Sequence, residues 1–240
     1  MAGVIALSRQ LAGTGRLALI GGGEFSFGET ADADRLWTGL ADAGRVGFLP
    51  TASGSADYGQ HFASYLGEGC DREVETIPVY RPRDARRQRN VDRIAACAAV
   101  YIGGGIGDEM VGTLRDSSAL EAIEERLRSG GTIVMIAAAA QAAGSSMRSL
   151  AGRDVVAGFG WVEAAAIEAN FLPTHDRRLR GLMQQPGIRI GLGLPAGSCL
   201  VVSGDGRTEL HGPAFVLEGH DADLKMLDAR SAVAESGVGE

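Results

Sequence analysis

The chain has 240 residues, of which 45% are hydrophobic and 22% are charged, a balance typical of a globular protein with a sizeable apolar core. Its formal net charge of −7 argues against nucleic acid or anionic lipid as a partner. No apolar run reaches the roughly 18–20 residues that span a membrane, and no basic segment followed by a long apolar stretch opens the chain. These features predict a cytoplasmic protein without a membrane partner.

Metals, cofactors and disulfides have little support. Cys70, Cys97 and Cys199 are far apart and form no C-x-x-C pair, which indicates free thiols in a reducing compartment. The four histidines are scattered, and the stretch LIGGGEFSFG lacks the G-x-G-x-x-G spacing of a dinucleotide site. The basic run RPRDARRQR at 81–89 is interrupted by Asp84, and we interpret it as a solvated loop or helix start. We therefore expect no metal and no cofactor.

Short apolar runs alternate with amphipathic helical patterns over the first 150 residues. Strands are predicted at 16–23, 45–53, 73–80, 99–105 and 132–138. Helices are predicted at 31–44, 58–69, 91–98, 118–131 and 140–150. Nearly continuous apolar strands separated by helices favour a three-layer α/β fold with a mostly parallel central sheet and helices on both faces.

The pattern changes after residue 150, where β segments replace the alternation. Segments 158–171 and 187–206 read as strands with tight turns, and 207–218 reads as a final hairpin pair. There is no internal repeat and no linker-like boundary. The predicted organisation is an N-terminal arm at 1–14, a single α/β domain at 15–228, and a flexible tail at 229–240.

Three strand ends are candidates for ligand contact, because open parallel sheets bind ligands at the carboxyl ends of their strands. They are Gly21 to Glu24, Gly103 to Gly105, and Ala137 to Gln141. Glycine at such ends lets backbone N–H groups approach a ligand closely. The expected ligand-binding residues are Gly22, Gly23, Gly104, Gly105, Ala140 and Gln141.

The stretch TIVMIAAAAQAAGSSM at 132–147 has the strand, small residues and helix of a nucleophile elbow. Such an elbow needs serine or cysteine at its apex, and this stretch offers four consecutive alanines. Ser145 and Ser146 lie about two turns into the predicted helix, too far from the strand end to serve as the apex. The junction therefore keeps the architecture of a site for covalent catalysis without an evident nucleophile.

The order of these landmarks resembles the peptidase S51 family, which comprises cyanophycinases and aspartyl dipeptidases with a class I glutamine-amidotransferase-like fold. The segments that carry the resemblance are LALIGGGEF, VGFLPTAS, AVYIGGG, GGTIVMIAAAAQAAG, AAAIEANF, RRLRGLM and GIRIGLGLPAGSCLVVSGDG. They cover roughly residues 15–220. The resemblance implies this fold and a homodimer.

The resemblance also implies where the family's catalytic residues fall, and two of them are replaced. The family's G-T-S-A-G-A elbow falls on 137–142, which puts the vestigial nucleophile position at Ala139 and places Gln141 at a glycine position. The family's D-Q-H-F segment falls on 168–171, so Asn170 stands where the histidine base would be. An amide cannot take a proton from a nucleophile as an imidazole does.

Two further family motifs lose their polar groups under the same resemblance. The G-G-N/D-Q turn falls on 103–106, where the polar pair is absent. The G-I-D-E-x-T-A-L turn falls on 193–200, where both carboxylates are absent. Gln141 is expected to fill part of the old site or to hydrogen-bond a ligand.

Three functional hypotheses follow. The first is a catalytically degenerate S51 homologue that binds a small molecule, peptide or protein without serine-dependent hydrolysis. The second is a repurposed enzyme that uses Glu168, His175 or Gln141 for cyclisation, isomerisation or transfer on a small metabolite or peptide. The third is residual peptidase activity through another nucleophile, with the candidates Ser198, Cys199 and Ser53. The sequence leaves open whether the protein is an enzyme.

Overall fold

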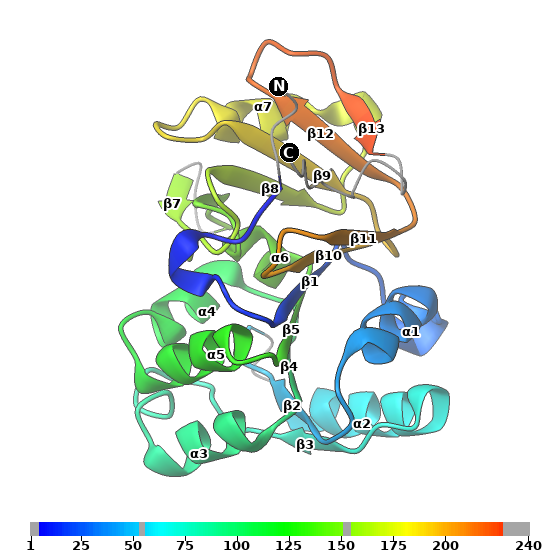
Figure 1. The fold of residues 1–240 in the computed structure, drawn as a ribbon, viewed down its shortest axis with the longest axis vertical. Coiled ribbons are helices and arrows are strands. Elements are labelled where there is room, and N and C mark those ends of the chain that lie inside the picture. The colour runs from blue at the N-terminus through cyan, green and yellow to red at the C-terminus, as the bar shows by residue number, and fades with distance from the viewer. Residues whose placement is uncertain (1–4, 53–55, 151–154, 228–240) are drawn as a thin grey trace, which may run out of the picture.

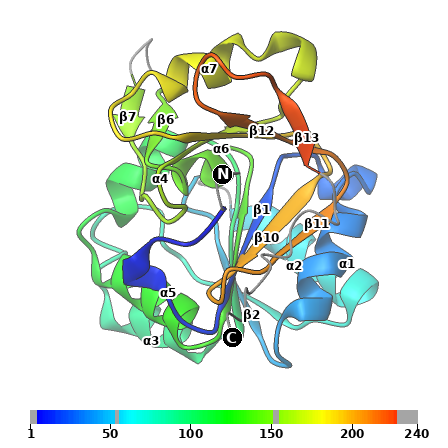
Figure 2. The same cartoon turned by 45° about the horizontal axis from the view of Figure 1, so that its top comes forward.

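The central sheet is built from the apolar strands of the first half of the chain. The computed structural model describes residues 5–52, 56–150 and 155–227 and shows this sheet with helices on both sides (Figure 1). Its strand order is β11-β10-β1-β5-β4-β2-β3, and the five strands from β1 to β3 run parallel. Figure 2 shows β10 and β11 extending the sheet beside β1, which they continue in antiparallel fashion. The bounds are β1 Arg16–Ile20, β2 Val46–Leu49, β3 Val74–Thr76, β4 Ala99–Ile102, β5 Thr132–Ile136, β10 Cys199–Ser203 and β11 Thr208–His211.

Helices cover both faces of this sheet because successive strand residues point to opposite sides and both sets are apolar. One face packs Ala18, Ile20 and their neighbours against α1 (Ala31–Leu40) and α2 (Ala56–Cys70). The opposite face packs Leu17 and Leu19 against α3, α4 and α5. These helices are Gln88–Ala96, Gly107–Leu114 and Ser118–Arg128. The three-layer α/β prediction is confirmed.

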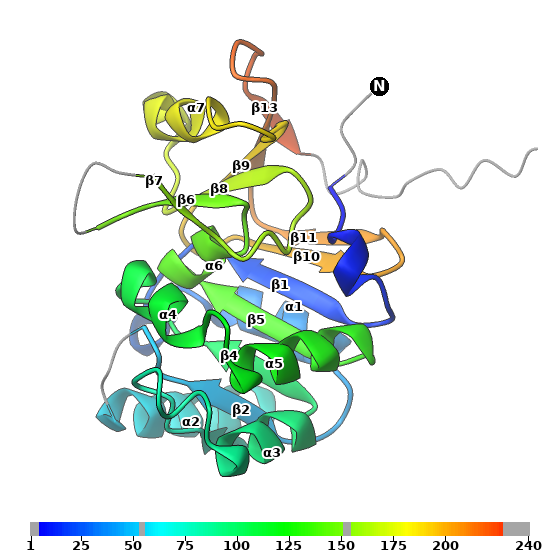
Figure 3. The same ribbon diagram turned by 90° about the vertical axis from the view of Figure 1, so that its left-hand side faces the viewer.

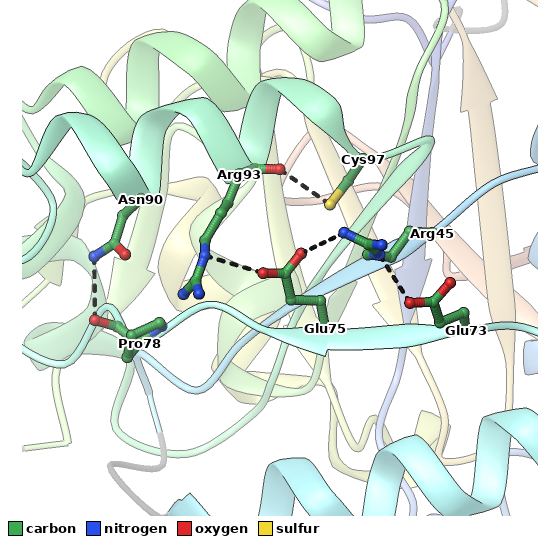
Figure 4. Close-up of polar contacts among 7 residues, drawn as sticks. All are labelled: Arg45, Glu73, Glu75, Pro78, Asn90, Arg93 and Cys97. Carbon is green, nitrogen blue, oxygen red and sulfur yellow. Dashed lines mark hydrogen bonds and ion pairs between the residues drawn. The ribbon is translucent and has the colours of Figure 1, made fainter.

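The edge strand β3 is fixed to its neighbours by charged side chains (Figure 4). Arg45, just before β2, forms ion pairs with Glu73 and Glu75 at 3.1 and 3.0 Å. Glu75 also pairs with Arg93 of α3 at 3.0 Å. Charged side chains on an edge strand discourage pairing with a further strand. The network thus holds β3 in place and makes it a poor partner for a further strand.

A second sheet stands beside the carboxyl end of the first (Figure 3). Its strand order is β13-β12-β9-β8-β6-β7. The strands are β6 Ser146–Arg148, β7 Val155–Ala157, β8 Ala165–Ala169, β9 Ile190–Leu194, β12 Ala214–Glu218 and β13 Lys225–Leu227. One face joins the main core through residues such as Ile167 and Leu192, and the other carries α7 (Arg177–Met183) through Leu179 and Leu182.

Two glycines of β9 let α7 and the end of β8 pack closely on this sheet. A Cβ at Gly191 would lie 2.5 Å from the sulfur of Met183, and a Cβ at Gly193 would lie 2.5 Å from the ring of Phe171. Side chains larger than hydrogen at these positions would push the helix and the ring away. The alternation of glycine in IGLGL is therefore a packing signal.

Several predicted elements are wrong at their ends or in kind. The helix expected at 140–150 is only the short α6 (Ala138–Ala142), and the chain then turns into β6. The strand expected at 73–80 is shorter than predicted, since β3 spans only three residues. The hairpin expected at 207–218 does not form, because β11 pairs with β10 in the first sheet while β12 pairs with β9 in the second.

Short helical turns complete the described chain. They are η1 Arg9–Leu11, η2 Phe25–Phe27 and η3 Pro173–His175. Within the predicted arm, Leu7 bridges to Val162 and Leu11 is fully buried. The predicted tail at 229–240 lies outside the described residues. Among the helices of the described ranges, none combines the length and apolarity that crossing a membrane requires.

Gly193→Ala tests the packing of Phe171. We expect it to lower the free energy of unfolding by about 1–3 kcal/mol, because the added methyl overlaps the ring. Urea denaturation measures the change. Gly112→Ala in α4 is the matched control, since a Cβ there meets no atom within 4 Å, and we expect it to stabilise by about 0.5–1 kcal/mol. Equal effects of the two substitutions would contradict the packing argument.

Candidate functional site

The turn between β5 and α6 has the backbone of a nucleophile elbow. Ala137 has φ 54° and ψ −118°, the conformation of the first central residue of a type II′ turn, which costs energy for any residue with a Cβ. Its N–H donates to the Ile20 carbonyl of β1 at 3.0 Å, and its carbonyl accepts from Gln141 at 3.1 Å. The strand therefore passes into the helix at a single strained residue.

The apex of this elbow is Ala137, two residues before the position expected from the sequence. Ala139 is a fully buried helical residue of α6 and cannot present a side chain at the turn. The prediction of an apex at Ala139 was wrong because the run from Ala137 to Ala140 contains nothing that distinguishes one register from another. With the apex at Ala137, Gln141 is the fourth residue of α6 and partly exposed.

The glycine loop after β4 lies against the elbow. A Cβ at Gly104 would lie 3.3 Å from the Ala137 methyl and 3.4 Å from the Ile136 carbonyl. Backbone hydrogen bonds among the described residues do not engage the N–H groups of Gly104, Gly105 or Ala138. These groups can donate to an oxygen placed at the turn. Two of the strand ends singled out in the sequence, Gly104 and Ala137, therefore lie side by side.

Asn170 lies at the end of β8 and is held against the end of β1. Its backbone is left-handed, with φ 49°, and its N–H donates to the Gly21 carbonyl at 2.6 Å. Its side chain occupies the space beside Gly22, where a Cβ would lie 2.1 Å from Asn170 Oδ1. The end of β1 thus lies between the elbow and Asn170.

A pocket of about 290 Å³ opens between the end of β8 and α7, which we call the α7 pocket. It is lined by Glu168, Asn170, Phe171, Leu172, His175 and Arg178. Three side chains singled out in the sequence, Glu168, Asn170 and His175, are therefore brought together. The residues expected to bind ligand, Gly22, Gly23, Gly104, Gly105, Ala140 and Gln141, do not line this pocket.

Three lining residues were missed by the sequence reading. Phe171 and Leu172 form an apolar wall, and Arg178 stands on the first turn of α7. The stretch RRLRGLM was a usable signal for a short helix, because Leu179, Leu182 and Met183 have helical spacing and leave Arg178 on the exposed side. Nothing in the sequence alone places that face over β8.

Glu168 is the most unusual group of the pocket. It is 7% exposed, and its Oε2 has no hydrogen-bond partner among the residues that the structure describes. Its Oε1 lies 4.0 Å from Nη1 of Arg178. Burial raises the pKa of Glu168, while the positive charges of Arg148 and Arg178 oppose the rise. A buried carboxyl without a full set of partners destabilises the fold and is a common sign of a functional site.

The remaining candidates have ordinary surroundings. His175 is exposed, and its Nδ1 lies 3.0 Å from the hydroxyl of Thr174. Ser198 is buried and donates to the Pro195 carbonyl at 2.7 Å, and burial raises the pKa of the Cys199 thiol. Ser53 lies outside the described residues. In the described ranges no three histidine, cysteine, aspartate or glutamate side chains gather as a metal would require.

A strained elbow after a central parallel strand, with a glycine loop beside it, is the arrangement of α/β proteins of the nucleophile-elbow class. The family model of Peptidase family S51 matches residues 17–210, and the chain belongs to this family. Its fold is accordingly of the class I glutamine-amidotransferase-like type expected from the sequence.

The relatives found among characterised proteins share low sequence identity with this chain. The chain is 24% identical over 200 residues to the cyanophycinases of Nostoc sp. (strain PCC 7120 / SAG 25.82 / UTEX 2576) and Trichormus variabilis (strain ATCC 29413 / PCC 7937). Each match covers 76% of this chain but only 66% of the relative, so the chain spans just under two thirds of their length.

Two solved structures share the fold. A peptidase from an acI-B1 Actinobacterium superposes with a TM-score of 0.75 at 22% identity, covering 91% of this chain and 96% of that one. A putative peptidase E protein from Listeria monocytogenes EGD-e gives a TM-score of 0.59 at 14% identity, covering 82% and 98%. At these identities the likeness concerns the fold alone.

Glycine scanning of the elbow tests its register. We expect Ala137→Gly to raise the free energy of unfolding by about 1 kcal/mol, because glycine adopts φ 54°, ψ −118° without strain. We expect Ala139→Gly, the matched control inside α6, to lower it by about 1 kcal/mol. Chemical denaturation measures both. Destabilisation by Ala137→Gly as large as that by Ala139→Gly would contradict an apex at Ala137.

Glu168→Gln tests the buried carboxyl through pH. Because the pKa of Glu168 is raised in the folded state, its stabilising contribution is complete below the ordinary value of 4.5 and is lost as the pH rises through the raised value. The unfolding free energy of Glu168→Gln, taken relative to the unmodified protein, is therefore expected to increase as the pH rises from the ordinary value of 4.5 through the raised pKa of Glu168. Urea denaturation across this range measures it, with Glu163→Gln, a half-exposed position, as control. A difference independent of pH would argue against a raised pKa.

Proposed function

We propose that this protein is a catalytically degenerate S51 homologue that binds a small molecule or peptide without serine-dependent hydrolysis. The single observation that carries the proposal is the apex of the elbow, where Ala137 holds the strained backbone of a nucleophile but only a methyl side chain. A methyl group has no electron pair with which to attack a carbonyl.

The proposal does not depend on the register of the elbow. Residues 137 to 140 are all alanine, so either alignment of the family motif leaves the nucleophile position without a hydroxyl or thiol. The position of the family's histidine base is also changed, because residue 170 is asparagine and its amide cannot accept a proton from a nucleophile. Two separate losses in one chain support abandoned hydrolysis over a single chance substitution.

Binding is supported by what the fold retains. The N–H groups beside Gly104 and Ala138 are free of backbone acceptors among the described residues, and the α7 pocket offers an apolar wall with polar groups. Since the chain spans 66% of the cyanophycinases it matches, their activity is not transferred to it. A homodimer and a cytoplasmic location stay predictions.

A fluorophosphonate probe tests the loss of hydrolysis directly. We expect the purified protein to give no labelling and no release of product from an aspartyl peptide, because the elbow at 137–140 carries only alanine. An authentic serine peptidase serves as the positive control. Labelling that is abolished by Ser198→Ala or by Ser53→Ala would contradict the proposal and favour a residual peptidase.

Rebuilding the two lost residues tests how far the site has diverged. We expect the double variant Ala137→Ser/Asn170→His to remain at least about 1000-fold below an active peptidase in kcat/KM, because residues 193–200 also lack the family's carboxylates. Steady-state cleavage of the same aspartyl peptide measures this, with Ala139→Ser/Asn170→His as the matched control. Rapid cleavage by the first variant would show that the rest of the machinery is intact.

A further inference from the structure

The arginine-rich segment singled out in the sequence forms an exposed basic surface. Six arginines lie within residues 81–93 together with only two acidic residues, Asp84 and Asp92, although the whole chain has a formal net charge of −7. Five of these arginines are exposed, and we call them the arginine surface: Arg81, Arg83, Arg86, Arg87 and Arg89. An acidic protein thus carries one region of concentrated positive charge.

Buried polar side chains fix the backbone beneath the arginine surface. Asp84 is buried, and its carboxylate lies 3.2 Å from Nη1 of Arg87 and accepts from the Tyr80 N–H at 3.4 Å. Asn90 is also buried and donates to the carbonyls of Asp84 and Pro78, the second of these contacts being drawn in Figure 4. The main chain is therefore already ordered, so binding a partner would order only side chains.

Two helix N-termini meet this segment and add to its positive potential. The helix α3 begins at Gln88, and no side chain caps its first turn. The N–H of Ala119, in the first turn of α5, donates to the Ala85 carbonyl at 2.9 Å. Because the N-terminal end of a helix carries partial positive charge, both ends favour a negatively charged neighbour at the same place as the arginines do.

The protein itself neutralises little of this charge. Arg83 and Arg87 share the carboxylate of Asp84, at 3.9 and 3.2 Å. Within the residues that the structure describes, Arg81 and Arg89 form no ion pair. One carboxylate of the described chain therefore serves five exposed guanidinium groups, and most of their charge is available to an anionic partner.

The composition of the surface favours an acidic peptide over nucleic acid. Proteins that bind single-stranded nucleic acid combine basic groups with aromatic rings on which the bases stack, and residues 81–93 include no aromatic residue. A long polyanion would also extend over the rest of an acidic protein and be repelled there. A short run of carboxylates matches the extent of the segment and avoids this repulsion.

We propose that the arginine surface is a docking site for a segment of a partner protein that is rich in aspartate and glutamate. Each guanidinium group can donate two parallel hydrogen bonds to a carboxylate of that segment. Figure 1 shows α3 at the opposite end of the molecule from α7, and no residue of the arginine surface lines the α7 pocket. The inference therefore goes beyond the proposed function and does not depend on the chemistry of the elbow.

Fluorescence anisotropy with a labelled peptide of alternating glutamate and glycine tests the proposal. We expect saturable binding at about 50 mM NaCl that weakens at least about tenfold at about 500 mM, because salt screens exposed charges. The same peptide with glutamine in place of glutamate is expected not to bind. The variant Arg81→Gln/Arg83→Gln/Arg89→Gln is expected to bind the glutamate peptide at least about tenfold more weakly.

A second triple variant controls for the change in net charge. Arg9→Gln/Arg177→Gln/Arg189→Gln removes the same charge from exposed positions outside the arginine surface. We expect it to keep the affinity of the unmodified protein within about twofold, because distant exposed charges are screened. All the substituted side chains are exposed, so circular dichroism is expected to show both variants folded.

The proposal is overturned if binding of the glutamate peptide does not saturate up to roughly 1 mM, or if the two triple variants bind it equally. It is also overturned if an oligothymidylate of equal charge binds as tightly as the peptide, since the surface would then be a site for nucleic acid. Sedimentation velocity tests one other occupant. Self-association that Arg81→Gln/Arg83→Gln/Arg89→Gln abolishes would assign the surface to a second copy of this chain instead.

Discussion

The carboxyl end of β1 is the point on which the two sheets and the candidate site depend. The Ile20 carbonyl accepts from Ala137 of the elbow, and the Gly21 carbonyl accepts from Asn170 of the second sheet. The Gly21 N–H donates to Ser198, and the Gly22 carbonyl accepts from Gly197. Four hydrogen bonds within three residues thus join β5, β8 and the turn before β10. These bonds are possible because residue 21 is glycine. A Cβ at this position would lie 2.0 Å from the Pro195 carbonyl oxygen and would force the two segments apart.

This convergence explains why the elbow and the α7 pocket are neighbouring but separate features. The elbow belongs to the first sheet and faces Gly104, whereas the pocket is formed by the end of β8 and by α7. Asn170 lies between them: its N–H bonds to Gly21, next to the Ile20 carbonyl that accepts from the elbow, and the residue lines the pocket. A molecule in the pocket would therefore lie against Asn170 and would not contact the elbow.

The sequence was sufficient for the layers of the fold and insufficient for the register of its site. Buried parallel strands such as β5 are continuous apolar runs, and this pattern is local, so it was read correctly. Four alanines in a row carry no local mark of where a strand ends, and the apex was placed at Ala139. The prediction of a hairpin at 207–218 was wrong for a related reason. The strands β11 and β12 pair with β10 and β9 in different sheets, and their own sequences do not specify these partners. The role of Arg178 likewise needed the position of α7 over β8.

The glycines at 191 and 193 have a consequence for how this protein can diverge. By omitting side chains on one face of β9, they let Met183 and Phe171 rest directly on the backbone of the sheet. Phe171, which lines the pocket, is thereby positioned by the main chain of β9 and not by a side chain that a substitution could change. Arg178 borders the same pocket from the exposed side of α7, so its charge and size can change over evolution without disturbing the packing of Phe171 on β9.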